Sequence, residues 1–179
     1  MARFEQSLRP ETRAVAVTWV HSGTGVKLPI RRMADVLVRV NAGGDEKDRV
    51  LLFVDGVHGF GVEDETGASL GCDFLIAGTH KWLFGPRGTG LVWARKGAWS
   101  ATTPTIPTMD PFWRPGARES MPPAAWMTPG GFQPFEHRWA VEQAFRFHLE
   151  IGKARVADRI HELNRMCKQD LSKMPRVRV

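Results

Sequence analysis

The chain has 179 residues, of which 42% are hydrophobic and 25% are charged, and this composition is typical of one folded domain with a single core. No run of 18 apolar residues is present and the first residues lack a signal-peptide core, so we expect a cytoplasmic protein that does not enter a membrane. The net charge of +6 comes from Lys and Arg scattered among acidic residues rather than gathered in a basic run, which argues against a nucleic-acid partner.

The two cysteines, Cys72 and Cys167, lie far apart in the sequence. They form no C-x-x-C pair and match neither a disulfide framework nor a zinc site. We therefore expect a reducing compartment and no bound metal.

The first half of the chain alternates short apolar runs with one helical pattern, which is typical of an α/β sheet. Residues 14–20 (AVAVTWV) predict a buried strand. Pro29 suits the start of a helix, whose apolar residues recur at helical spacing until residues 41–44 end it. Residues 50–54 predict the next strand, so these elements form a right-handed βαβ unit with parallel strands.

Residues 74–77 predict a third strand, and residues 91–94 predict a fourth. The link between them contains the glycine-rich segment 85–90 (GPRGTG) and is too short for a crossover helix. The fourth strand is therefore expected to run antiparallel to the third. The predicted fold class is α/β, with a mostly parallel sheet that has one antiparallel strand.

The second half of the chain begins with a proline-rich segment, residues 100–134, that shows neither helical nor strand periodicity and predicts a long loop. A helical pattern follows from residue 136 to residue 172, with Gly152 as a candidate kink. Residues 176–179 (RVRV) have the pattern of an opening strand.

The segment most informative about chemistry is residues 78–82 (GTHKW), which places Lys81 at the carboxyl end of the third predicted strand. Asp55 ends the second predicted strand, 26 residues earlier. Open α/β sheets bind their ligands at the carboxyl ends of the strands. Pyridoxal phosphate (PLP) needs an amine to form an imine and a carboxylate to keep its ring nitrogen protonated, so Lys81 and Asp55 favour PLP as the cofactor.

His58, Thr79 and His80 are further candidate donors, to the ring oxygen or to the phosphate of such a cofactor. Taken singly, each could equally cap a turn or pack in the core. Lys81 alone could be a loop lysine in solvent, and Asp55 alone could be a helix cap. The joint spacing of these residues is what favours the cofactor site.

These motifs resemble the class V aminotransferase family of fold-type I PLP enzymes. That family has a strand ending in Asp-x-x-His or Asp-x-x-Gln, then a His-Lys turn, then Gly-Pro-x-Gly-x-Gly and a reversed strand; the matching segments here are residues 55–58, 79–81 and 85–90. The resemblance covers nearly the whole chain. Residues 128–140 (TPGGFQPFEHRWA) look more like isopenicillin N epimerase and its relatives than like the cysteine desulfurases.

The resemblance implies a role for each candidate residue. Lys81 would form the Schiff base with PLP, and Asp55 would pair with the pyridinium nitrogen. His58 would contact the ring oxygen, while Thr79 and His80 would bind the phosphate. An amino acid is the implied small-molecule substrate, and the implied reaction is epimerisation, elimination or transamination.

Two other segments gain roles from the resemblance. Ser22, or its neighbour His21, lies where the family places a strand-end residue that contacts cofactor or substrate. Thr128, Gly130 and Gly131 resemble the segment that in dimeric relatives reaches the phosphate bound by the partner subunit. A homodimer is therefore expected.

Members of the family are much longer than this chain, so the resemblance implies the central part of a longer enzyme. Residues 1–134 would then be part of the PLP-binding large domain, residues 135–174 a long helix leading toward an absent small domain, and residues 175–179 the start of a strand.

Two alternative functions stay open from the sequence. The first is a truncated, catalytically incompetent fragment that needs another polypeptide. The second is a nucleotide-binding module that uses residues 85–90 for phosphate. The second is disfavoured because this turn leads into a strand and the chain has no G-x-x-x-x-G-K-[ST] motif.

Overall fold

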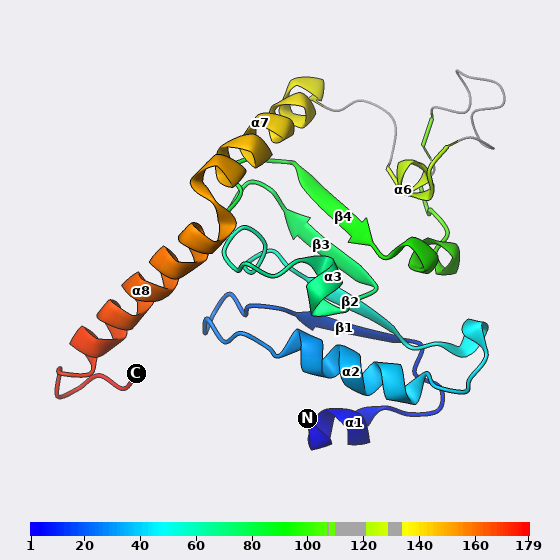
Figure 1. Ribbon diagram of the computed structural model, residues 1–179, viewed down its shortest axis with the longest axis horizontal. Helices are drawn as coiled ribbons and strands as arrows, with labels where there is room; N and C mark the ends of the chain where they lie inside the picture. Colours follow the sequence, from blue (N-terminus) through cyan, green and yellow to red (C-terminus); the bar gives the residue numbers. More distant parts are fainter. Residues whose placement is uncertain (107, 110–120, 129–133) are drawn as a thin grey trace.

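A four-stranded sheet forms the centre of the molecule in the computed structural model, which describes residues 1–106, 108–109, 121–128 and 134–179. The strands are β1 (Ala14–Thr18), β2 (Leu51–Asp55), β3 (Phe74–Gly78) and β4 (Gly90–Ala94), in that order across the sheet (Figure 1). The first three strands run parallel, and β4 runs antiparallel to β3. The predicted mixed sheet is therefore confirmed.

Helix α2 (Ile30–Val40) connects β1 to β2, as the periodicity predicted. Asn41 follows its last residue, and the Asn41 side chain accepts a hydrogen bond from the Val50 amide (2.8 Å) and donates one to the Val50 carbonyl (3.0 Å). The end of the helix is therefore tied to the start of β2.

The connection from β2 to β3 contains a short helix that the sequence reasoning did not predict, α3 (Gly67–Leu70). Thr66 caps its start by accepting a hydrogen bond from the Ser69 amide, and the Ser69 hydroxyl accepts one from the Thr66 amide in return. Gly71 ends it with a φ of 73°, a left-handed conformation that glycine adopts without strain.

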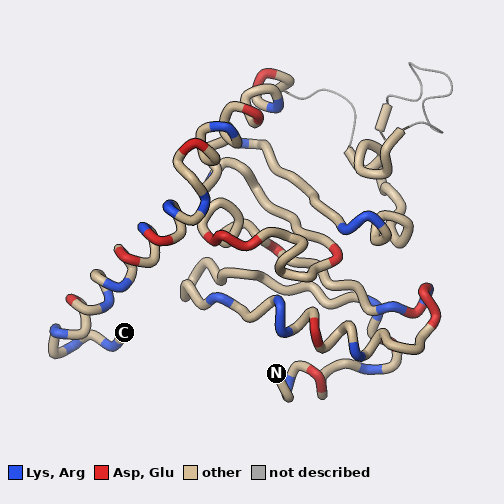
Figure 2. The backbone as a smooth tube through the Cα atoms, in the orientation of Figure 1, with Lys and Arg blue, Asp and Glu red and all other residues tan. Residues whose placement is uncertain are grey.

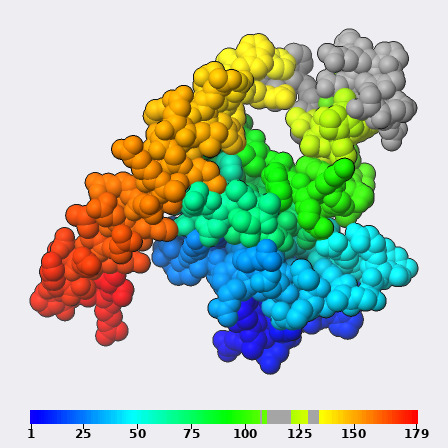
Figure 3. Space-filling model, viewed as in Figure 1, coloured from blue at the N-terminus to red at the C-terminus, as the bar shows by residue number. Residues whose placement is uncertain are grey.

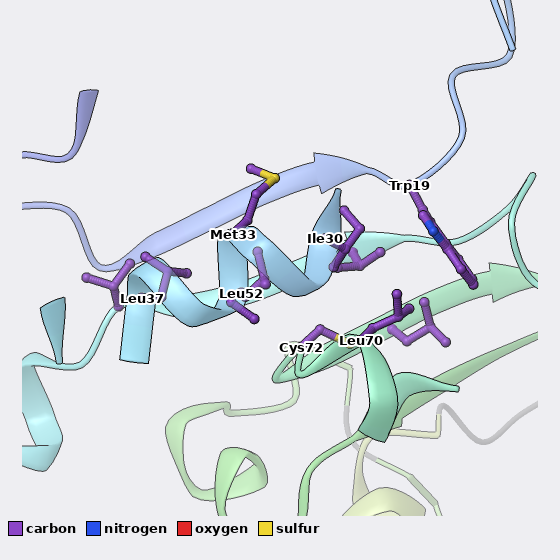
Figure 4. Packing of buried hydrophobic residues seen from close by; sticks show 11 residues of the cluster. Trp19, Ile30, Met33, Leu37, Leu52, Leu70 and Cys72 are labelled. Atoms are coloured by element: carbon purple, nitrogen blue, oxygen red, sulfur yellow. The ribbon is translucent and has the colours of Figure 1, made fainter. Parts of the chain in front are cut away.

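The main core lies between α2 and one face of the sheet (Figure 4). Ile30, Met33, Ala34 and Leu37 recur at the spacing of one helix face, and all are at most 6% exposed. Burying one large apolar side chain contributes about 1.5 to 3 kcal/mol. The other members of this cluster come from the strands and the adjoining loops: Trp19, Val50, Leu52, Val54, Leu70, Cys72 and Leu75.

The two faces of the sheet differ sharply in how well they are covered. Strand pairing places Leu52, Val54 and Leu75 on the face toward α2, where each is at most 2% exposed. On the opposite face, Ile76 is 42% exposed and Val92 is 51% exposed. We call this second surface the open face; it consists of Ala16, Thr18, Phe53, Asp55, Phe74, Ile76, Val92 and Ala94.

One end of the open face is covered by Trp99 of the 3-10 helix η2 (Lys96–Ala101). The Trp99 ring meets that of Phe74 edge to face at 5.7 Å, and Phe74 stacks on Phe53 at 4.6 Å. The other end of the open face, which includes Asp55, is left uncovered by the described residues. The remaining short elements are α1 (Ala2–Ser7), η1 (Glu46–Asp48) and α6 (Pro123–Trp126).

The predicted long loop, residues 100–134, is described only in part. Its residues 107, 110–120 and 129–133 lie outside the described residues. The described parts contain α6 and the end of η2. The proposed division of the chain at residues 134 and 174 stays a prediction.

The predicted single helix of residues 136–172 is two helices, α7 (Phe135–Ile151) and α8 (Lys153–Leu171). Gly152 separates them with φ 94° and ψ 124°, values that do not continue an α-helix. The candidate kink at Gly152 is therefore a break. Residues 175–179 have turn and irregular structure and pair with no described strand, so the expected opening strand is not formed.

Helix α8 extends away from the body of the molecule (Figure 3), and basic and acidic residues are interspersed along it (Figure 2). Its contact with the body of the molecule centres on Glu63, which is 7% exposed. His161 Nε2 lies 3.0 Å from one Glu63 oxygen, and Lys27 Nζ lies 2.7 Å from the other. Lys153, at the start of α8, donates to the Asp64 carbonyl at 2.8 Å.

Two opposing effects set the pKa of Glu63. Burial acts to raise it, but hydrogen bonds from Lys27 and His161 outweigh burial and hold the pKa below its ordinary value of 4.5. A carboxylate with a lowered folded-state pKa stabilises the fold above its unfolded pKa, and this stabilisation is lost as the pH falls through the folded value.

We predict that Glu63→Gln lowers the free energy of unfolding by about 1 to 3 kcal/mol at neutral pH, because it removes charge-assisted hydrogen bonds at a buried position. The difference from wild type should shrink as the pH falls below 4.5, the ordinary value for Glu63. Urea denaturation at a series of pH values measures both effects.

The matched control is Glu162→Gln on α8, whose carboxylate is 51% exposed and pairs with Arg159 at 2.7 Å. Exposed pairs of this kind contribute less than about 1 kcal/mol. Equal losses for the two variants would show that Glu63 does not hold α8 to the body.

Candidate functional site

The loops that follow β2 and β3 meet at one contact between side chains. Lys81 lies in the turn just after β3, and its Nζ is 3.0 Å from His58 Nε2. His58 lies three residues beyond the end of β2. Because β2 and β3 are parallel neighbours, their carboxyl ends share one edge of the sheet, as the sequence predicted.

A glycine allows these two loops to approach each other. Gly61 has a φ of 86°, and a Cβ atom added there would lie 2.9 Å from both the carbonyl carbon and the carbonyl oxygen of Trp82. Both atoms belong to the backbone, so a larger residue would push the turn that carries Lys81 away from the loop after β2.

Asp55 presents an exposed carboxylate at the end of β2. The Val57 amide donates to its Oδ1 at 3.0 Å, and the Thr18 hydroxyl donates to its Oδ2 at 3.5 Å. Thr18 reaches it because the β1 and β2 register pairs these two residues. No described residue forms an ion pair with Asp55, so this carboxylate is held in place yet open to a cationic partner.

Trp82 is a member of this cluster that the sequence reasoning did not assign. Its indole Nε1–H donates to His58 Nδ1 at 3.3 Å, so His58 is contacted on one ring nitrogen by Trp82 and on the other by Lys81. Its position directly after Lys81 was the available signal. Thr18, the donor to Asp55, was likewise missed, although it lies near the end of the first predicted strand.

The predicted phosphate-binding residues occupy two different environments. Thr79 is 0% exposed, and its hydroxyl contacts the hydroxyl of Thr89, which in turn donates to the Pro86 carbonyl. His80, the next residue in the sequence, is exposed. Their phosphate contacts stay predictions; for Thr79, the hydroxyl would first have to turn from Thr89.

The two remaining predicted segments lie in loops. Ser22 is exposed in the loop after β1, where His21 Nδ1 lies 3.1 Å from the Thr24 hydroxyl. Thr128 follows α6, and its hydroxyl donates to the Ala124 carbonyl at 3.1 Å. Gly130 and Gly131 lie outside the described residues. The structure does not bring Ser22 or Thr128 into a described contact with Lys81.

The donor set at this edge fits the needs of PLP. An exposed carboxylate without an ionic partner can accept the pyridinium N–H, and an exposed amine beside an imidazole can reach an aldehyde. The cleft of about 470 Å³ between β4 and α7 is a separate feature, since its lining does not include Lys81 or Asp55.

The amino-acid sequence matches the family model described as Aminotransferase class-V over residues 1–179. The chain belongs to the class V aminotransferase family. Within the family, isopenicillin N epimerase of Amycolatopsis lactamdurans is 28% identical over 190 aligned residues, which cover 93% of this chain and 42% of the relative. The predicted family resemblance is thus confirmed.

Solved structures agree on the fold of this class V chain. A mutant of C-DES with glycine covalently linked to the PLP cofactor matches with a TM-score of 0.81 and 21% identity, covering 97% of this chain and 45% of that chain. The apo structure of cysteine desulfurase from Thermococcus onnurineus NA1 matches with a TM-score of 0.74 and 20% identity, covering 96% of this chain and 41% of that chain.

This chain spans less than half the length of the relatives it matches. Among the described residues, no helix combines the length and apolar character that crossing a bilayer requires.

We predict that Gly61→Ala lowers the free energy of unfolding by about 2 to 4 kcal/mol, because it adds backbone strain and a clash with the Trp82 carbonyl. Gly43→Ala is the matched control, since Gly43 has a φ of 84° but nothing within 4 Å of an added Cβ. The control should lose only the strain, about 1 to 2 kcal/mol. Urea denaturation compares the two, and equal losses would argue against a tight approach of the loops.

Proposed function

We propose that this chain carries the cofactor-binding half of a PLP-dependent class V enzyme that acts on an amino acid. The observation that carries the proposal is the Lys81 amine held 3.0 Å from His58, one strand away from the exposed Asp55 carboxylate. In this proposal Lys81 holds the cofactor covalently through its aldehyde.

Each described residue at the site then has a defined task. Asp55 accepts a hydrogen bond from the protonated ring nitrogen, and Thr18 and the Val57 amide hold the carboxylate in position. When bound, the cofactor supplies an electron sink for the bond that breaks at the substrate α-carbon. Lys81 would hold the cofactor and, as a free amine, would serve as the base that moves the α-proton.

We propose that His58 supports Lys81 both with and without bound cofactor. Its Nε2 meets the lysine amine in the structure, and the same ring edge can face the ring oxygen of the cofactor. We propose that His80 and Thr79 contribute to phosphate binding, with Thr128, Gly130 and Gly131 reaching a second subunit of a homodimer. The proposed reaction is epimerisation, elimination or transamination, and the residues described at this site are compatible with each.

We predict that the protein mixed with PLP develops an absorption band that borohydride reduction removes, leaving the cofactor attached to Lys81 in the peptide mass spectrum. Lys81→Ala should abolish the attachment, whereas Lys168→Ala, an exposed lysine on α8, should leave it unchanged. Asp55→Asn should weaken binding about ten- to a hundredfold, because a hydrogen bond between charged groups is lost.

Attachment that is spread over several lysines, or that persists in Lys81→Ala, would argue against the proposed site. Circular dichroism of each variant confirms that the chain is folded before the result is interpreted.

A second candidate function follows from the open face: the chain is catalytically incompetent until further polypeptide of the class V fold covers this surface. Parallel sheets in α/β proteins are covered on both faces. Here one face is closed by α2, whereas Ile76 and Val92 on the other are 42% and 51% exposed. This chain covers 42% of the length of isopenicillin N epimerase of Amycolatopsis lactamdurans.

The open face also includes the cofactor carboxylate. Asp55 pairs with Thr18 on β1 and with Ile76 on β3, and Ile76 pairs with Val92 on β4, so these four residues form one row across the sheet. A segment that covers Ile76 and Val92 would therefore border Asp55. Covering the face would exclude water from the carboxylate and strengthen its hydrogen bond to the ring nitrogen.

We predict that the isolated 179-residue chain binds a hydrophobic dye and self-associates, and that Ile76→Gln reduces both. Val38→Gln is the matched control, since Val38 is 68% exposed on α2, away from the open face. Dye fluorescence and analytical ultracentrifugation measure the outcome. A monodisperse wild-type monomer without dye binding would contradict this second candidate function.

A further inference from the structure

Helix α7 lies beside the two loops that form the candidate site (Figure 1). On the loop after β2, the Phe60 ring meets that of Phe145 on α7 edge to face, with centroids 6.0 Å apart. On the turn after β3, the Phe84 ring lies 5.6 Å from that of Phe147 and 6.1 Å from that of His148. One helix from the second half of the chain therefore touches both loops.

His148 makes a polar contact from α7 to the loop after β2. The residue is 3% exposed, and its Nε2 lies 2.8 Å from the carbonyl oxygen of Gly61, which is also buried. A carbonyl oxygen can only accept, so His148 Nε2 carries a proton and donates, in the neutral imidazole and in the imidazolium alike. No backbone amide of the described residues donates to this carbonyl. His148 therefore satisfies a buried acceptor that a purely apolar side chain would leave unpaired.

Gly61 is also the residue at which the two loops approach each other. A Cβ atom added there would lie 2.9 Å from the carbonyl group of Trp82, which directly follows Lys81. His58 precedes Gly61 in the same loop. Movement of Gly61 would therefore shift the loop that carries His58 relative to the turn that carries Lys81.

We propose that His148 is a positioning residue, whose hydrogen bond to the Gly61 carbonyl fixes the loop after β2 against the turn after β3 and so holds His58 at the Lys81 amine. The described residues show no direct contact between His148 and Lys81, so the effect passes through Gly61. The effect on the contact between His58 and Lys81 concerns the chain alone. Its consequence for cofactor attachment rests on the proposed PLP function.

Three variants separate the hydrogen bond from the packing of α7. His148→Gln keeps an N–H donor on a side chain of similar reach, whereas His148→Leu keeps a side chain of similar bulk and removes the donor. Ala144→Gly is the matched control, because Ala144 is 8% exposed on the same helix and glycine there weakens the helix without removing the bond to Gly61. Circular dichroism verifies that each variant is folded.

The first test measures the nitrogen chemical shifts of His58 in the protein without cofactor, with selectively labelled histidine. Lys81→Ala provides the reference shifts for a His58 that has lost its lysine contact. We expect His148→Leu to move the His58 signals from their wild-type values toward this reference. His148→Gln and Ala144→Gly should leave the His58 signals close to those of wild type.

The second test follows the rate at which pyridoxal becomes attached to Lys81 at fixed neutral pH, with borohydride trapping and peptide mass spectrometry. His148→Leu should slow attachment about two- to tenfold, the range expected from loss of one hydrogen bond, because the Lys81 amine is held in place less of the time. His148→Gln should restore most of the rate, and Ala144→Gly should keep the wild-type rate.

Three outcomes of the first test would overturn the inference. One is that the His58 signals do not move in His148→Leu, or do not move in Lys81→Ala. Another is that His148→Gln moves them as far as His148→Leu, since the donor would then be irrelevant. The third is an equal movement in Ala144→Gly, which would assign the effect to the stability of α7.

The second test separates this inference from the proposed function. An unchanged attachment rate in His148→Leu overturns the consequence for the cofactor. The expected His58 signals, together with a wild-type protein that does not attach pyridoxal to Lys81, would keep His148 as the positioning residue and reject the PLP function.

Discussion

The contact between the loops that follow β2 and β3 is the constraint on which the candidate site depends. His58 and Lys81 come from different strands, yet their side chains lie within hydrogen-bond distance because Gly61 lets one loop approach the backbone of Trp82. His58 and Lys81 are far apart in the sequence but close in space, so their contact requires the parallel pairing of β2 and β3. The contact between Lys81 and His58 thus depends on the order of the strands.

Most of the sheet could be predicted from the sequence because each strand is an apolar run bounded by clear turn residues. The reversed β4 followed from the length of its link alone. Helix α3 was missed because four residues are too few to show helical periodicity. The break at Gly152 was underestimated, since the apolar pattern continues on both sides of it and says nothing about the glycine backbone.

The candidate site was predicted in outline but not in detail. Lys81, Asp55 and His58 were selected as candidates because their residue types and spacing match a chemical need. Trp82 and Thr18 were not found because they act on other side chains, and such pairs are set by tertiary geometry rather than by sequence spacing. The burial of Thr79 against Thr89 also depends on how the GPRGTG turn folds back, which residue types alone do not specify.

The loop contact and the open face affect different parts of the candidate site. The loop contact positions Lys81, whereas the open face includes Asp55. The loops can preorganise Lys81 within this chain, because Trp82, His58 and Gly61 are all present and in contact. Asp55 has its Thr18 and Val57 donors but lies in a row whose apolar members remain in water. Since a charge pair is stronger where water is excluded, the lysine half of the proposed site is closer to completion than the carboxylate half. In the proposed PLP site, covering the open face would therefore strengthen the hydrogen bond of Asp55 to the ring nitrogen more than it would change the reactivity of Lys81.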